Sequence, residues 1–119
     1  MPIKPTVKIL KQLKKKGYKL YILSNIGEKS LKCIEERHPD VFKLFDGIYT
    51  ASDRDGYIKK PQPEIYKRYL DKFGQNPNEL IFIDDKKSNL TAAKKFGIDT
   101  IHFTSAKNLF KVLSKRKAF

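Results

Sequence analysis

The feature that most constrains the fold is a regular alternation of amphipathic helical patterns with short apolar runs. Helices are predicted for residues 5–17, 28–37, 63–74, 88–97 and 105–117. Strands are predicted for residues 18–25, 47–51, 79–85 and 98–103. Strands separated by helices of this length form parallel sheets with right-handed crossovers. We therefore expect a single α/β domain over residues 1–119, with a parallel sheet of about four strands and flanking helices.

The chain is strongly basic, with a formal net charge of +13 that comes mostly from lysine. The lysines recur on every predicted helix, whereas specific readers of nucleic acid rely on arginine. This pattern favours a solvated surface over a nucleic-acid footprint, so we expect no nucleic-acid partner. A single cysteine, Cys33, excludes an internal disulfide and favours a reducing cytoplasm. No apolar run has the length of a membrane span, and we expect no membrane partner.

Polar side chains gather where the predicted strands end. In parallel sheets, sites form just beyond the carboxyl ends of the strands. The residues predicted there are Ser24, Asn25, the loop 51–60, Asp84, Asp85 and residues 102–104. Two adjacent carboxylates need a cation, which points to Mg²⁺, and a lysine beside them would neutralise phosphate oxygens. Ser24 and backbone N–H groups at the start of the next helix would hold an anion.

Three stretches carry a resemblance to the haloacid dehalogenase-like (HAD) hydrolase superfamily, in particular to its capped phosphatase and dehalogenase branch. PTVKILKQLKKKGYKLYILSN, residues 5–25, resembles the helix, strand and second motif of that family. KKPQPEIY, residues 59–66, resembles the third motif. FIDDKKSNLTAAKKFGIDTIHF, residues 82–103, resembles the fourth motif and the segment after it. The resemblance implies a three-layer, Rossmann-like fold and a Mg²⁺-dependent hydrolase.

The resemblance also implies which residues contact phosphate. It places Ser24 and Asn25 at the phosphate-binding positions of the second motif. Lys60, adjacent to Pro61, corresponds to the catalytic and phosphate-binding lysine of the third motif. Lys59 is the alternative, because this loop is one residue longer than the usual family pattern.

The fourth motif implies the metal site. By this match Asp85 is the direct Mg²⁺ ligand, Asp84 supports it and Asn89 belongs to the outer shell. The pairing of these carboxylates with Lys60 fits a Mg²⁺-dependent phosphatase better than a dehalogenase. The expected substrate class is therefore a phosphorylated small molecule, and its identity depends on a cap that these residues do not include.

The family's first motif is an apolar strand that ends in Asp-x-Asp and provides the nucleophile. No such strand is found before Pro5. The stretch SDRDGY contains Asp53 and Asp55 with the right spacing, but it falls between the second and third motifs. Tyr57 also stands where the family prefers threonine or valine. We therefore interpret this stretch as a polar loop that leads to Lys60.

The missing motif has consequences for structure and activity. We expect the central first strand of the sheet to be absent and the apolar surface left behind to favour a homodimer or a complementing polypeptide. Alone, the chain is expected to bind Mg²⁺ weakly or not at all and to be inactive. A fragment of a longer product, a split gene product and a degenerate copy all remain open.

Two functions follow from these patterns. The first is the core region of a Mg²⁺-dependent phosphate-monoester phosphatase. The alternative is a non-enzymatic binding or regulatory module that keeps the scaffold and contacts an anionic partner such as RNA. His102 falls within the last predicted strand, and we interpret it as a packing residue because no partners are spaced for zinc.

Overall fold

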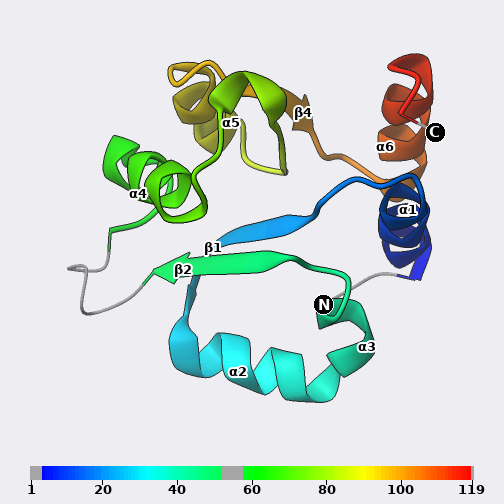
Figure 1. The fold of residues 1–119 in the computed structure, drawn as a ribbon, viewed down its shortest axis with the longest axis horizontal. Helices are drawn as coiled ribbons and strands as arrows, with labels where there is room; N and C mark the ends of the chain where they lie inside the picture. Colours follow the sequence, from blue (N-terminus) through cyan, green and yellow to red (C-terminus); the bar gives the residue numbers. More distant parts are fainter. Residues whose placement is uncertain (1–3, 52–57, 119) are drawn as a thin grey trace. The chain divides into compact units, whose positions relative to one another are not determined.

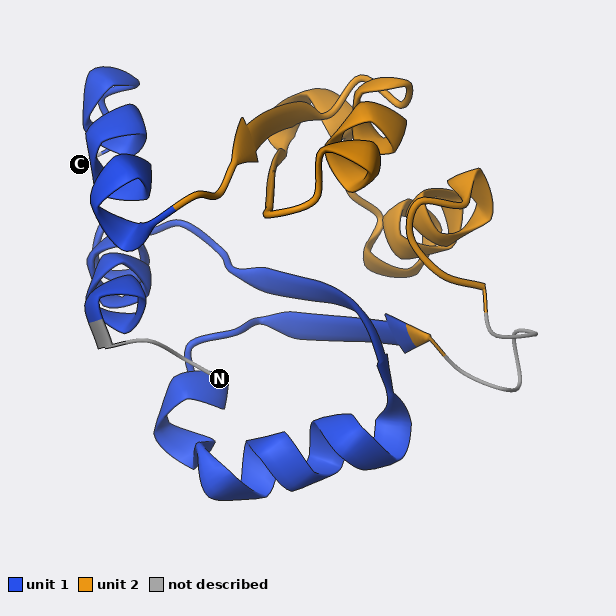
Figure 2. Ribbon diagram, turned by 180° about the vertical axis from the view of Figure 1, so that it is seen from behind, with its two compact units in different colours: residues 1–50, 105–119 blue, residues 51–104 orange. Residues whose placement is uncertain are grey.

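The computed structural model describes residues 4–51 and 58–118 (Figure 1). The chain divides into two compact units, which Figure 2 distinguishes by colour. The first comprises Met1–Thr50 with Ser105–Phe119, and the second comprises Ala51–Thr104. The expectation of one domain over residues 1–119 stays a prediction.

The first unit contains most of the helices. Its elements are α1 (Lys4–Lys15), β1 (Tyr21–Gly27), α2 (Glu28–Arg37), α3 (Pro39–Phe42), β2 (Gly47–Ala51, whose last residue belongs to the second unit) and α6 (Ala106–Lys115). β1 and β2 form a two-stranded sheet. Helix α1 packs against α6, and their apolar sides bury Ile9, Leu13, Leu109 and Leu113. The first and last predicted helices therefore share one apolar core.

An ion pair joins the end of α1 to the loop before β2. Lys14 Nζ lies 2.6 Å from Asp46 Oδ2, which also accepts a 2.8 Å hydrogen bond from the backbone N–H of Leu20. The hydrogen bond from Lys14, followed by that from Leu20, lowers the pKa of Asp46. Because the pair is in contact with water, its contribution to stability is small.

The second unit is a βαβ arrangement with one further helix. Its elements are α4 (Pro63–Phe73), the 3₁₀ turn η2 (Pro77–Glu79), β3 (Ile81–Asp84), α5 (Lys87–Lys94) and β4 (Asp99–His102). β3 and β4 are parallel, and their register runs from Ile81 opposite Asp99 to Asp84 opposite His102. Helix α5 provides the crossover and packs on both strands. The predicted parallel pairing of these strands is confirmed.

The core of the second unit surrounds Tyr66, which is almost completely buried. Its ring meets Phe82 of β3 edge-on and Phe96 at a tilt, each with ring centroids 5.9 Å apart. Ala92 and Ala93 are buried on α5, and such small side chains allow a helix to approach its sheet closely. Helix α4 ends at Gly74, whose φ of 59° is a left-handed conformation that glycine adopts without strain.

The α/β class is confirmed. In the described part of the chain, four strands form two pairs, β1 with β2 and β3 with β4. The joining of these pairs into one sheet and the absence of a central strand stay predictions.

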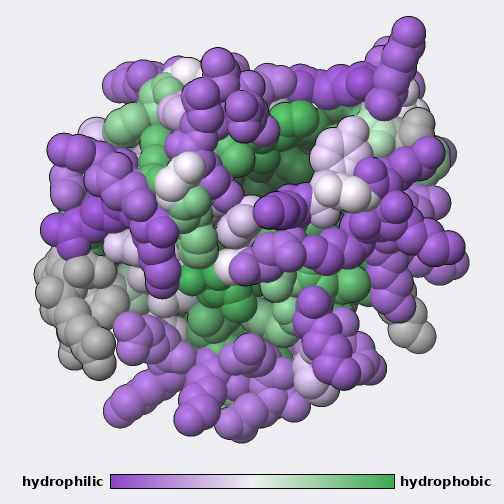
Figure 3. Space-filling model, in the orientation of Figure 1, coloured by the Kyte–Doolittle hydropathy of each residue, from purple (hydrophilic) through white to green (hydrophobic). Residues whose placement is uncertain are grey.

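Lysines of the helices lie at the surface. Lys8, Lys11 and Lys15 of α1 are exposed, as are Lys107 and Lys111 of α6. Hydrophilic residues occupy most of the outermost positions on the face drawn in Figure 3. The polar sides of these helices are thus in contact with solvent. Among the described residues, no helix is both long enough and apolar enough to cross a bilayer.

Candidate functional site

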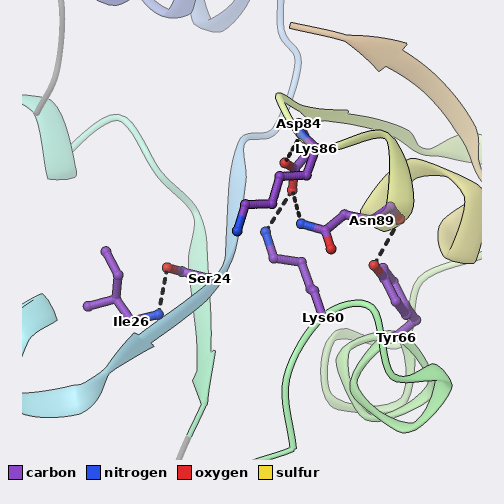
Figure 4. Close-up of polar contacts among 7 residues, drawn as sticks. All are labelled: Ser24, Ile26, Lys60, Tyr66, Asp84, Lys86 and Asn89. Atoms are coloured by element: carbon purple, nitrogen blue, oxygen red, sulfur yellow. Dashed lines mark hydrogen bonds and ion pairs between the residues drawn. The ribbon is translucent and has the colours of Figure 1, made fainter.

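Asp84, the last residue of β3, is the centre of a polar cluster (Figure 4). Its Oδ2 lies 2.8 Å from Lys60 Nζ and accepts a 3.1 Å hydrogen bond from Asn89 Nδ2. Its Oδ1 accepts a 2.9 Å hydrogen bond from the backbone N–H of Lys86. Three of the residues that the sequence singled out, Lys60, Asp84 and Asn89, therefore meet at one carboxylate.

Local structure explains this convergence. β3 ends at Asp84, and α5 begins three residues later at Lys87. Asn89 stands on the first turn of α5, which places its side chain beside the strand end, and it is 3% exposed. Lys60 precedes α4, whose first residue, Pro63, suits a helix start. A strand end, a helix start and a pre-helical loop thus supply one residue each.

The environment of Asp84 keeps its carboxylate charged. Only 7% of its side chain and 11% of that of Lys60 are exposed. Burial raises the pKa of Asp84, but the hydrogen bonds from Lys60, Lys86 and Asn89, together with the lysine charge, more than offset it and leave the pKa below its usual value. The ammonium group of Lys60 also lies 5.3 Å above the centre of the Phe82 ring, a cation–π arrangement.

Tyr66 stabilises this cluster through a hydrogen bond to Asn89, a role that the sequence did not reveal. Its hydroxyl donates a 2.8 Å hydrogen bond to the backbone carbonyl of Asn89, and this links α4 to the first turn of α5. Burial, followed by the charge of Asp84, raises the pKa of Tyr66 to about 12. The hydroxyl therefore stays protonated and able to donate. The available signal was chemical: a buried tyrosine hydroxyl needs a partner.

We expect Tyr66→Phe to lower the free energy of unfolding by about 1 kcal/mol, because it removes one buried hydrogen bond and leaves the Asn89 carbonyl without this donor. Urea denaturation of the variant measures the loss. Tyr18→Phe is the matched control, since Tyr18 is 46% exposed and the same atom is removed. Equal losses in the two variants would contradict the role given to the Tyr66 hydroxyl.

Asp85 lies directly after β3 and differs from Asp84 in its surroundings. Its side chain is exposed, and no hydrogen bond or ion pair joins its carboxylate to another residue in the described ranges. Its backbone carbonyl oxygen lies 2.9 Å from Nε2 of His102. Since Asp84 already accepts three hydrogen bonds, Asp85 is the carboxylate of the pair that has oxygen atoms left for a ligand.

Magnesium chemistry suits these donors in kind. Mg²⁺ prefers oxygen ligands and is bound by one or two carboxylates together with water or phosphate oxygens. Asp84 and Asp85 provide adjacent carboxylates, but residues 4–51 and 58–118 contain no group of three or more His, Cys, Asp and Glu side chains placed to hold a metal. The residues described here fit part of a magnesium site.

Ser24 and Asn25 occupy positions that differ from the expected ones. We expected both just beyond the end of a strand, at the start of a helix. Instead β1 continues through Gly27, and α2 begins only at Glu28. Ser24 Oγ accepts a 3.1 Å hydrogen bond from the N–H of Ile26, and its own hydroxyl hydrogen remains a donor. Both residues belong to the first unit, so their meeting with Asp84 stays a prediction.

The structure distinguishes the two candidates for the third-motif lysine but does not describe the stretch SDRDGY. Lys60 contacts Asp84, whereas Lys59 is exposed and its backbone N–H donates to Oε1 of Gln62. Of the two candidates, the cluster thus contains Lys60. Asp53 and Asp55 lie outside the described residues, and their interpretation as part of a loop stays a prediction.

Known proteins resemble this chain over most of its length. A family model described as haloacid dehalogenase-like hydrolase matches residues 1–97. A sesquiterpene phosphatase of Aspergillus oryzae is 35% identical over 98 residues, which are 82% of this chain and 48% of that protein. An (S)-2-haloacid dehalogenase of Burkholderia cepacia is 33% identical over 99 residues, or 83% of this chain and 42% of that enzyme.

Solved structures show the same relationship. A HAD family enzyme of Bacteroides thetaiotaomicron, crystallised with magnesium and inorganic phosphate, is 28% identical with a TM-score of 0.74. The similarity covers 86% of this chain and 52% of that one. The chain therefore spans about half the length of the relatives that it matches.

Proposed function

Because the chain belongs to the haloacid dehalogenase-like hydrolase family, we propose that it forms the core region of a Mg²⁺-dependent phosphate-monoester phosphatase. The observation that carries this proposal is the buried carboxylate of Asp84, held by Lys60 and Asn89 beside the exposed carboxylate of Asp85. An ion-paired, hydrogen-bonded strand end of this kind can order a neighbouring metal ligand. The substrate is a phosphorylated small molecule.

In this proposal each residue has its own role. Asp85 is the direct ligand of Mg²⁺, and Asp84 and Asn89 order the turn that presents it. The Lys60 ammonium compensates the charge of Asp84 and would also neutralise phosphate oxygens of the substrate. When bound, Mg²⁺ would stabilise negative charge on the phosphate oxygens. Ser24 and Asn25 contribute a hydroxyl and an amide to phosphate binding.

Phosphate ester hydrolysis is preferred over dehalogenation for a chemical reason. Relatives of both kinds resemble the chain, so similarity alone does not choose between them. Adjacent Asp84 and Asp85 are ligands suited to a hard divalent cation, and the Bacteroides relative was crystallised with magnesium and inorganic phosphate. A divalent cation offsets the negative charge of a phosphate ester, which a haloacid substrate does not carry to the same degree.

The nucleophile is proposed to come from outside these 119 residues. The family's Asp-x-Asp strand would be supplied by a further segment of a longer polypeptide or by a separate, complementing one. A homodimer is a second means of covering apolar surface, although it would not supply the nucleophile. The single cysteine supports a location in the cytoplasm.

The proposal predicts that the purified 119-residue chain does not hydrolyse an aryl phosphate in the presence of Mg²⁺ above the rate in buffer. Addition of a polypeptide that carries an apolar strand ending in Asp-x-Asp is expected to produce turnover. With p-nitrophenyl phosphate as the aryl phosphate, release of p-nitrophenol measures both rates. Turnover by the chain alone that disappears in Asp53→Asn would show that SDRDGY provides the nucleophile, and the proposal would be wrong on this point.

A second measurement tests the alternative function. Binding of a short RNA to the same chain, followed at increasing salt, is expected to be weak and to show no preferred sequence. Tight, steeply salt-dependent binding without phosphatase activity in any complemented mixture would favour the binding module instead.

A further inference from the structure

His102, the last residue of β4, makes a contact that its sequence position did not predict. Its Nε2 lies 2.9 Å from the backbone carbonyl oxygen of Asp85. A carbonyl oxygen can only accept a hydrogen bond, so Nε2 must carry the hydrogen. The interpretation of His102 as a packing residue is therefore incomplete, since its ring also makes a directed polar contact.

Sheet register explains why His102 can reach this atom. Asp84 and His102 are paired positions of the parallel strands β3 and β4. The backbone N–H of Phe103, the residue directly after β4, donates a 2.9 Å hydrogen bond to the carbonyl of Asp84. The two strands end at Asp84 and His102, and the histidine side chain holds the first carbonyl beyond the end of β3. Phe103 and His102 thus donate hydrogen bonds to two successive carbonyls, those of Asp84 and Asp85.

The consequence concerns the direction of the Asp85 side chain. Its carboxylate is exposed and has no hydrogen bond to another described residue, so its direction depends on the backbone of the turn. That turn is held by the Lys86 N–H bond to Asp84 and by the His102 bond to the Asp85 carbonyl. Loss of the histidine bond would leave the peptide between Asp85 and Lys86 held at its N–H alone, and the backbone that directs the carboxylate would be less well ordered.

We propose that His102 is a positioning residue that orders the Asp85 carboxylate for binding of a divalent cation. The inference rests on the proposed function, because it takes Asp85 as the ligand. Groups that hold the ligands of a metal site commonly change metal affinity by about 10- to 100-fold when they are removed. A residue with a purely structural role would change stability and leave affinity unaltered.

Two substitutions separate these roles. His102→Phe keeps a ring of similar size but has no N–H donor, whereas His102→Gln places an amide N–H near the position of Nε2. Mn²⁺ serves as the probe, and calorimetric titration of the complete 119-residue chain measures its Kd. We expect a Kd about 10-fold higher in His102→Phe and within about threefold of the parent in His102→Gln. An unchanged Kd in His102→Phe would overturn the inference, as would equal losses in both variants.

Amide hydrogen exchange in the metal-free chain distinguishes failure of this inference from failure of the proposed function. His102→Phe is expected to accelerate exchange of the Lys86 amide, which donates to Asp84, whereas His102→Gln is expected to leave it close to the parent rate. If the parent binds no Mn²⁺ yet exchange changes in this way, His102 still positions the turn, but its proposed effect on metal binding by this chain is overturned. Unchanged exchange in His102→Phe would overturn the positioning role itself.

Discussion

Replacement of Lys60 by methionine is expected to lower the free energy of unfolding by about 3 kcal/mol, the low end of the loss seen when one partner of a buried ion pair is removed. Methionine keeps a side chain of similar length but loses the cation–π contact with Phe82 and leaves the Asp84 carboxylate without its cation. The low end is chosen because 11% of the lysine and 7% of the aspartate side chain still meet solvent. Urea denaturation at neutral pH measures the loss.

The neighbouring lysine provides the control. Lys59→Met makes the same chemical change at an exposed side chain and is expected to alter stability by less than about 0.5 kcal/mol. The double variant Lys60→Met with Asp84→Asn is expected to recover part of the loss, since it removes the uncompensated charge. A Lys60→Met protein as stable as the Lys59→Met protein would contradict the energetic role of the pair.

The pH dependence of the same variant provides a second signature. The pKa of Asp84 in the folded chain lies below its usual value, because the hydrogen bonds and the charge of Lys60 outweigh burial. A lowered folded pKa means that the carboxylate contributes stability above the unfolded pKa, and that this contribution is lost as pH falls through the folded pKa. Lys60→Met removes a hydrogen bond and a charge that hold the pKa down, so the folded pKa rises and the variant loses less stability on acidification than the parent. The difference in stability between the two proteins should therefore narrow as pH falls. Denaturation at a series of acidic pH values measures the shift.

Replacement of Asp85 by asparagine is expected to weaken Mn²⁺ binding by about 100-fold, more than the loss expected for His102→Phe, because it removes a charge from the proposed ligand itself. Folding should be affected little, since the side chain is exposed and makes no hydrogen bond to another described residue. The expected result is therefore a large loss of affinity with a nearly unchanged Tm.

Asp71→Asn is the matched control for this variant. Asp71 is an exposed aspartate of α4 in the same unit, and its substitution makes the same change in net charge. Comparable loss of Mn²⁺ binding in Asp71→Asn and Asp85→Asn would indicate diffuse electrostatic attraction and would contradict a site at Asp85. If only Asp84→Asn abolished binding, the roles of the two adjacent carboxylates would have to be exchanged.

Much of the fold and site could be predicted from local patterns. The alternation of helices and strands, the end of β3 at the aspartates and the end of α4 at Gly74 follow from periodicity and from backbone preferences of single residues. Lys60, Asp84 and Asn89 were singled out by the family resemblance, and the structure brings them together, although their roles stay predictions. The helices and strands could be predicted because each depends on a short stretch of chain.

Other features depend on packing between distant segments, which a local pattern does not encode. Two hydrogen bonds could not be predicted locally: the one from the Tyr66 hydroxyl to the Asn89 carbonyl and the one from His102 to the Asp85 carbonyl. Their acceptors are backbone carbonyls, which every residue has. The extension of β1 through Gly27 was likewise not predicted. The sequence by itself determined which segments are helices and strands and which polar residues follow the end of β3. Only the tertiary structure decided which backbone groups accept hydrogen bonds from Tyr66 and His102, since these bonds depend on distances between elements far apart in the chain.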